Sequence, residues 1–181
     1  MLSIQPKWCE LIASGKKTVE VRKTRPKIDT PFNCYIYCTK QKVNGEILLT
    51  YDKKVEGRNR GFRDEGDIAL AGKVIGEFVC NYIEDFKEFE YGIDALHRHI
   101  KLNACINYDE IYQYLGFEKC GYGWNISNLV IYDKPKELSE FKHWKKFDWW
   151  DYGHHKNKPQ WELRSLSRPP QSWCYVEEGA K

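Results

Sequence analysis

The chain has 181 residues, with 29 Lys plus Arg against 26 Asp plus Glu, so its formal net charge at neutral pH is +3. This length fits one domain with a sizeable hydrophobic core, and a composition of 15% aromatic and 30% charged residues excludes a disordered chain and a membrane-spanning one. We expect no membrane association, because no apolar run reaches the roughly 18 residues that cross a bilayer. The first residues lack the basic and then apolar layout of a secretory signal, which predicts a cytoplasmic protein.

Several common classes of site have no signature in this sequence. The seven cysteines are an odd number without CxxC spacing, which argues against a disulfide framework or a zinc ribbon. There is no Walker loop, no complete dinucleotide-binding glycine motif, no HExxH and no GxSxG. We therefore predict no metal site and no cofactor, and the nucleotide-hydrolysing and nicotinamide-dependent classes are disfavoured.

Strands dominate the predicted secondary structure, and helices are few. The first helix is expected from Pro6, which suits the first helical position, to Ser14, because Gly15 can end it in a left-handed conformation. A second helix is expected over 108–115, where three apolar residues share one face. Strands are expected over 18–23, 33–39, 46–51, 67–70, 73–82, 124–132 and 172–177. Strands and helices do not alternate regularly, which favours an α+β fold: a small mixed β-barrel with a few packed helices.

The segment from Gly15 to Lys23 concentrates groups that can do chemistry. Its alternating pattern predicts a strand with Val19 and Val21 facing inward. Three polar side chains are expected on the outward face: Thr18, Glu20 and Arg22. With Lys16 and Lys17 at the start of the strand, these groups can grip a phosphate and hydrogen-bond a base. The alternative is an ordinary exposed strand on which Glu20 and Arg22 pair at the surface, with little effect on stability.

Further residues are predicted to bind ligand around this segment. Phosphates would be held by Lys16, Lys23 and Arg25, with help from the basic loop 53–63 unless that loop is only a solvated surface. Trp124 follows two glycines and begins a strand, so its indole is expected either to stack on a base at the mouth of a cleft or to lie in the core. Asn125 and Ser127, which follow Trp124, are the remaining predicted ligand-binding residues. Trp8 is expected in the core, because apolar residues share its helix face.

Three stretches of the chain together resemble the ASCH family of the PUA-like superfamily. They are the opening 2–23, the sequence GKVIGEF at 72–78 and the sequence GWNISNL at 123–129. The resemblance covers roughly 1–140, and residues 168–175 resemble the ending of phage and prophage members. It implies a small β-barrel domain over 1–140, with a cleft beside the first helix and an association with RNA or modified nucleobases. Residues 141–181 would form an aromatic-rich extension packed on the same domain.

The resemblance also suggests an activity. Some compact members of the family are amidohydrolases that act on N4-acetylcytidine, with a catalytic lysine in a Gly-x-Lys-Thr segment, a threonine three residues later and a distal glutamate. Lys17 matches the lysine, Glu20 stands in place of the threonine, and no motif locates a distal glutamate. Other members are described as ribonucleases. A lysine can act as a base only when burial or a nearby cation lowers its pKa, and a carboxylate such as Glu20 opposes that shift.

Three functions are compatible with these observations. The leading hypothesis is a protein that binds nucleic acid, RNA above all, or a modified nucleotide in a basic cleft. The first alternative is a hydrolase in the same cleft, acting on a modified nucleoside or on RNA, with Lys17 and Glu20 as catalytic residues. The second alternative is a phage-encoded interaction protein that binds a protein partner through the aromatic insert Trp144–Trp161.

Overall fold

The computed structural model describes residues 1–40, 42–43, 46–47, 50–51, 68–86, 102–116, 121–147 and 160–179. Within these ranges the chain is mostly β, with two short helices, α1 (Pro6–Ala13) and α3 (Tyr108–Leu115). The strands are β1 (Leu2–Ile4), β2 (Val19–Arg22), β3 (Phe32–Cys38), β4 (Lys42–Val43), β5 (Glu46–Ile47), β6 (Thr50–Tyr51), β7 (Ile68–Ala69), β8 (Val74–Cys80), β9 (Ile83–Asp85), β10 (Tyr122–Asn125), β11 (Ser127–Lys136), β12 (Phe141–Phe147), β13 (Gln160–Ser165) and β14 (Glu177–Glu178). No helix in these ranges is long and apolar enough to cross a membrane.

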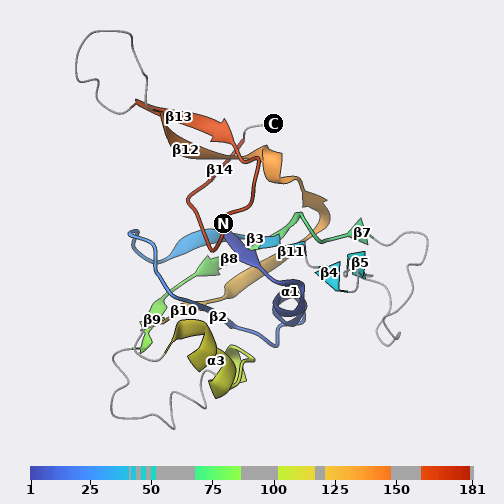
Figure 1. Cartoon of the computed structure of the whole chain (residues 1–181), viewed down its shortest axis with the longest axis vertical. Helices are drawn as coiled ribbons and strands as arrows, with labels where there is room; N and C mark the ends of the chain where they lie inside the picture. The colour runs from blue at the N-terminus through green and yellow to red at the C-terminus, as the bar shows by residue number, and fades with distance from the viewer. Residues whose placement is uncertain are drawn as a thin grey trace.

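Two sheets form the body of the domain (Figure 1). One sheet has the order β1-β3-β8-β11, and the other has the order β2-β10-β9. Only Ile126 separates β10 from β11, so the chain passes directly from one sheet into the other. The described strand pairs do not close into a ring. The expected β-barrel is therefore corrected to two sheets that share one interrupted strand, which the sequence pattern had presented as a single strand.

The main hydrophobic core brings the two sheets together. It contains Leu2 from β1, Ile36 from β3 and Phe78 from β8, all at most 1% exposed, together with Trp124 from β10. The six cysteines in the described ranges are free, and four of them are buried. The core therefore lies between β10 and the sheet that contains β1.

Both faces of β2 are covered, which was not expected. Val19 and Val21 pack against Ile111 and Leu115 of α3 in a second cluster, so the inward direction predicted for these valines is confirmed. The opposite face carries Glu20 and Arg22, which the pattern placed at the surface; both residues are only 6% exposed. That prediction is wrong because the opposite face of β2 lies against the main core.

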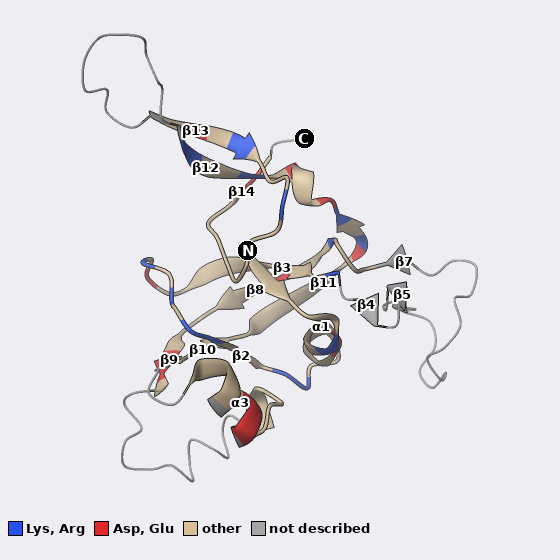
Figure 2. Ribbon diagram, in the orientation of Figure 1, with Lys and Arg blue, Asp and Glu red and all other residues tan. Residues whose placement is uncertain are grey.

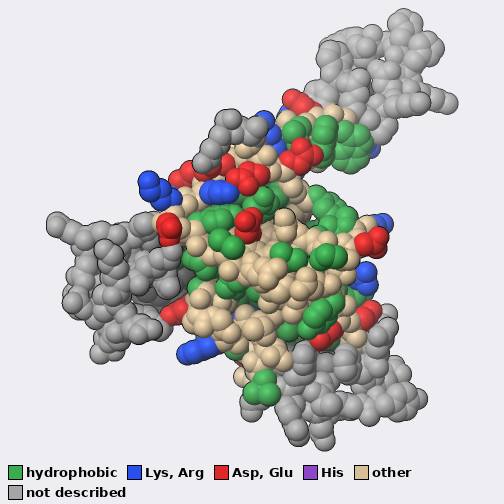
Figure 3. Space-filling model, turned by 180° about the vertical axis from the view of Figure 1, so that it is seen from behind, with side chains coloured by type: hydrophobic (Ala, Val, Ile, Leu, Met, Phe, Trp, Pro, Cys, Tyr) green, Lys and Arg blue, Asp and Glu red, His purple; other side chains and the backbone are tan. Residues whose placement is uncertain are grey.

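The C-terminal part forms a third sheet, in the order β13-β12-β14, and the β12–β13 hairpin projects from the body (Figure 1). Phe141 and Leu166 at its base are buried with Met1 and Val74. Hydrophobic side chains also gather on the hairpin surface seen from behind (Figure 3). Within the predicted insert Trp144–Trp161, both end residues are exposed, and positions 148–159 lie outside the described residues.

Residues 170–175, which we call the C-terminal strap, lie along the free edge of β1. The Ser3 amide donates to the Ser172 carbonyl at 2.9 Å. Leu2 and Trp173 form an antiparallel bridge. The strand expected over 172–177 is otherwise limited to the two residues of β14. The strap therefore covers the side of β1 that does not pair with β3.

Candidate functional site

A cavity of about 440 Å³ opens beside α1. Its walls come from β1, α1, β2, α3 and the C-terminal strap. Five charged side chains line it: Lys7, Lys17, Glu20, Arg22 and Glu110. The volume falls within the range of about 300–1,000 Å³ that is typical of small-molecule sites.

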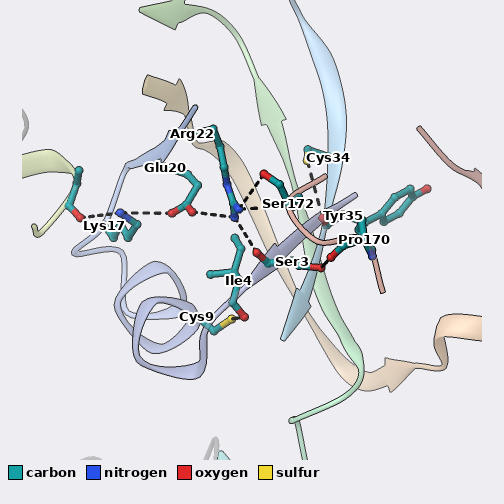
Figure 4. Close-up of polar contacts among 11 residues, drawn as sticks. Ser3, Ile4, Cys9, Lys17, Glu20, Arg22, Cys34, Tyr35, Pro170 and Ser172 are labelled. Carbon is teal, nitrogen blue, oxygen red and sulfur yellow. Dashed lines mark hydrogen bonds and ion pairs between the residues drawn. The ribbon is translucent and has the colours of Figure 1, made fainter. Parts of the chain in front are cut away.

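Three of these charged side chains form a buried row on one side of the cavity (Figure 4). The Lys17 ammonium lies 3.3 Å from one Glu20 carboxylate oxygen, and Arg22 lies 2.9 Å from the other. Exposure of these side chains is 3% for Lys17, 8% for Glu20 and 7% for Arg22. Such a row is costly to remove from water unless every charge has close partners.

Local backbone structure explains how Lys17 reaches this row. Gly15 has a φ of +71°, a value that glycine adopts without steric cost, and it ends the turn after α1. The Lys17 amide then donates back to the Leu11 carbonyl at 2.9 Å. Its side chain points inward, where the ammonium donates to the Ala104 carbonyl at 2.6 Å. The turn after α1 and the segment before α3 thus fix Lys17 from two directions.

The other end of the row is held by β1 and the strap. Arg22 donates to the Ser3 carbonyl at 2.8 Å. It also lies 3.5 Å from the Ser172 carbonyl and 3.4 Å from the Ser172 hydroxyl. Its buried Nε has no hydrogen-bond partner in the part of the chain that the structure describes. Arg22 therefore links β2 to both terminal segments of the domain.

The buried row carries two positive charges and one negative charge when all its members are ionised. Burial lowers the pKa of Lys17, while the Glu20 carboxylate acts to raise it. Lys17 has three N–H donors when protonated, and Ala104 and Glu20 accept from two directions. The row is therefore suited to a ligand that brings negative charge or a hydrogen-bond acceptor, and a neutral Lys17 amine could also accept a proton.

The structure places Trp124 in the core, one of the two positions expected for it, and it brings Trp8 to the cavity as well as against the core. Trp124 is 2% exposed and packs edge-on against Phe32, with ring centroids 5.6 Å apart, so it lies in the core away from the cavity lining. Trp8 lines the cavity, and the ammonium groups of Lys7 and Lys17 lie 4.2 and 4.9 Å from its ring centroid. The buried stripe of α1 runs through Pro6, Cys9 and Ile12. Trp8 lies at the margin of that stripe, and this spacing along α1 could have indicated that Trp8 is only partly buried.

The remaining predicted ligand-binding residues are not part of the cavity lining. Thr18 donates to the Asn103 side chain at 3.3 Å, and Ser127 donates to the Val79 carbonyl at 2.7 Å, both within the fold. Asn125 pairs with Val19 across β10 and β2. Three basic residues of the prediction are exposed: Lys16, Lys23 and Arg25.

One of these three basic residues, Lys23, contacts a residue of the cavity lining. Its ammonium is 5.1 Å from the ring centroid of Tyr114, which lines the cavity. Figure 2 shows basic residues both before and after β2, so positive charge flanks the strand that carries Glu20 and Arg22. The basic loop 53–63 lies outside the described residues. Sequence reasoning did not place Trp8, Tyr114, Ser3, Gln5 or the strap at the cavity.

Comparisons with known proteins give one family and a set of solved structures. A crystal structure of ASCH from Zymomonas mobilis is 18% identical, with a TM-score of 0.49, covering 76% of this chain and 71% of that chain. Crystal structures of two mutant forms of the Zymomonas mobilis protein are also 18% identical to this chain and cover 76% of it. The first has a TM-score of 0.49 with 73% of its own chain covered, and the second has a TM-score of 0.45 with 72% covered. No curated protein matches significantly. The ASCH domain matches residues 2–152, and the chain therefore belongs to the ASCH domain family.

Proposed function

We propose that the cavity binds one nucleotide unit, either within an RNA strand or as a free modified nucleotide. The ASCH domain is associated with RNA binding or nucleoside hydrolysis. The observation that carries the proposal is the buried row of Lys17, Glu20 and Arg22, whose three ionised groups carry one net positive charge beside a cavity of about 440 Å³. An anionic ligand would supply the missing charge.

The lining supports a nucleotide more than a simple anion. Phosphate can accept from the Lys17 ammonium and from the exposed ammonium groups of Lys7 and Lys23. Trp8 and Tyr114 supply aromatic rings from the two helices, and such rings stack on bases. The combination of cations and aromatic rings thus matches a ligand that has both a phosphate and a planar base.

Binding can be tested with two neighbouring lysines, of which one is buried in the cavity wall and the other is exposed outside it. We expect Lys17→Ala to weaken binding of ribonucleoside 5′-monophosphates or a short single-stranded RNA at least tenfold, because it removes a charge-assisted contact worth about 1.5–3 kcal/mol. Lys16→Ala is the matched control, because Lys16 is exposed and does not line the cavity. Isothermal titration calorimetry gives the affinities, and thermal melting shows whether each variant is folded.

The outcome separates this site from general attraction to basic residues. Equal losses in Lys16→Ala and Lys17→Ala would indicate nonspecific charge attraction, and binding that survives Lys17→Ala would refute the site. Affinity should also fall as salt rises, because phosphate contacts release counterions.

A second candidate function is hydrolysis in the same cavity. It is favoured by one observation, that burial lowers the pKa of Lys17 and so increases its neutral fraction. With N4-acetylcytidine as substrate, water would add to the acetyl carbon, the amide C–N bond would break, and acetate and cytidine would form. Lys17 would take a proton from the attacking water and pass it to the departing N4 amine as the C–N bond breaks, and Glu20 would hold Lys17 in place through their 3.3 Å contact.

Mass spectrometry can decide between binding and turnover. The protein is incubated with N4-acetylcytidine and, separately, with mixed cellular RNA, and both the retained and the altered species are identified. A product that forms with the wild type and is lost in Lys17→Ala and Glu20→Gln supports a hydrolase. Retention without alteration supports a binding protein, and turnover that persists in both variants places the chemistry elsewhere.

A further inference from the structure

The charged row has little free hydrogen-bonding capacity with which to distinguish one base from another. Glu20 accepts from both Lys17 and Arg22. Arg22 in turn donates to the Ser3 carbonyl and lies within reach of two Ser172 oxygens. Ammonium and guanidinium groups also donate only, so they can hold an anion but cannot match an edge that presents a donor next to an acceptor. Selection of a base therefore needs other groups in the cavity.

Two uncharged amide side chains line the same cavity, Gln5 and Gln171, and both are exposed. Gln5 is the N-cap residue of α1, and its side chain makes no hydrogen bond to the helix backbone. Neither amide has a hydrogen bond to another residue within the described ranges. Each amide therefore offers a free donor and a free acceptor.

The two amides come from neighbouring backbone segments. The bridge between Leu2 and Trp173 is antiparallel. Gln171 lies two residues before Trp173 on the strap, and Gln5 directly follows the last residue of β1. The two segments are tied together between this bridge and the amides, since the Ser3 amide donates to the Ser172 carbonyl at 2.9 Å. Both amides therefore line the cavity from two segments that are hydrogen-bonded to each other.

We infer that Gln5 and Gln171 read the hydrogen-bonding edge of the bound base. This inference deepens the proposed function and rests on it. The ligand class is a planar heterocycle that presents a donor beside an acceptor, attached to the anionic group that the charged row attracts. The strap, which lies beyond the family match at 2–152, is then part of the specificity site rather than only a tie between the chain ends.

The inference can be tested by comparing ligands that have a base with a sugar phosphate that lacks one. Calorimetry measures the affinities of the four ribonucleoside 5′-monophosphates and of ribose 5-phosphate, which lacks a base. The variants are Gln5→Ala and Gln171→Ala, with Gln113→Ala as the matched control, because Gln113 is exposed on α3 and does not line the cavity.

We expect each cavity variant to weaken binding of the preferred monophosphate about tenfold, the size of effect expected for one bidentate amide contact. The spread of affinities among the four bases should narrow, and the affinity for ribose 5-phosphate should not change. Gln113→Ala should behave as the wild type. Thermal melting is run on each variant, and the unchanged ribose 5-phosphate affinity separately reports an intact cavity.

Four results would overturn the inference. If Gln5→Ala and Gln171→Ala bind the monophosphates as the wild type does while Lys17→Ala does not, the amides do not read the base and the proposed function stands. If both cavity variants lose ribose 5-phosphate equally, the amides shape the cavity instead. If Gln113→Ala is weakened to the same degree, the effect is not specific to the cavity. If the wild type binds none of the probes, the proposed function fails together with the inference.

Discussion

Replacing Glu20 by glutamine tests how much the fold depends on the buried carboxylate. The change keeps the shape of the side chain but leaves Lys17 and Arg22 as two buried cations with no anion between them. With an effective dielectric constant of 20, the Coulomb attraction is about 5 kcal/mol at 3.3 Å and about 6 kcal/mol at 2.9 Å, before the cost of desolvation is subtracted. Removing one partner from a buried ion pair typically costs about 3–5 kcal/mol, and we expect Glu20→Gln to lower the free energy of unfolding by that amount.

Urea denaturation followed by circular dichroism measures this loss. With a slope of about 2 kcal/mol per molar urea, the midpoint should fall by about 2 M. Glu110→Gln is the matched control, because Glu110 pairs with Lys7 at 3.7 Å while their side chains are 44% and 55% exposed. An exposed pair of this kind should contribute at most about 1 kcal/mol.

A double variant shows whether charge is the cause of the expected loss. Lys17→Met combined with Glu20→Gln returns the row to one net positive charge, so it should be less destabilised than the sum of the single variants. A Glu20→Gln cost below about 1 kcal/mol, similar to that of Glu110→Gln, would refute the reasoning that this row is a tightly coupled buried element.

Three other outcomes follow from described residues. Burial lowers the pKa of Lys17 in the folded protein below 10.5, the value in the unfolded chain, so at a pH between these two pKa values the unfolded chain binds more protons. The free energy of unfolding of the wild type, relative to that of Lys17→Met, should therefore rise with pH in this window. Urea titrations at several alkaline pH values measure this difference, and a difference that falls with pH would contradict the lowered pKa. Gly76→Ala should destabilise the domain by about 1–3 kcal/mol, because a Cβ there would meet the Val130 carbonyl oxygen at 2.3 Å; an unchanged melting temperature would show that the sheet adjusts freely. On β12, Phe141→Ala should lower the free energy of unfolding by about 3–5 kcal/mol, because Phe141 is 0% exposed. Trp144→Ala on the same strand should lower it by at most about 1 kcal/mol, because Trp144 is 53% exposed. Equal losses of stability in urea titrations would contradict this burial pattern.

The interaction role suggested for the insert Trp144–Trp161 stays a prediction. Trp144 and Trp161 are 53% and 60% exposed at the two ends of the insert. A pull-down with the wild type and with a variant that lacks the insert is the relevant measurement. We expect a protein partner to be lost with the deletion, and capture that is insensitive to the deletion would count against the role.

Elements set by local patterns were predictable from the sequence. Pro6 and Gly15 bracket α1, whose helical residues end one position before the predicted boundary, and the bounds of α3 agree with those predicted. The alternation of Val19 and Val21 gave the correct direction for one face of β2. In each case, neighbouring residues carry enough information to set the conformation.

Features that depend on distant segments were not predictable. Burial of Glu20 and Arg22 requires β1, β10 and the strap, which lie far from β2 in the sequence. The choice between the two positions open to Trp124 has the same cause, because the β2–β10 pairing places Trp124 opposite Glu20, on the core side of the sheet. A local apolar pattern shows that a face is buried, but it does not show which segment covers it.

The contact between Arg22 and Ser172 also bears on how the protein forms during synthesis. Arg22 emerges from the ribosome about 150 residues before Ser172, the difference between their positions. At the usual rate of about 5–20 residues per second, that interval lasts roughly 8–30 seconds. Throughout it, the guanidinium lacks its partners in the strap, and β2 lacks β10 until residue 125 has emerged. The nascent chain therefore cannot form the complete site while it is being synthesised. The site must assemble after the strap has been translated.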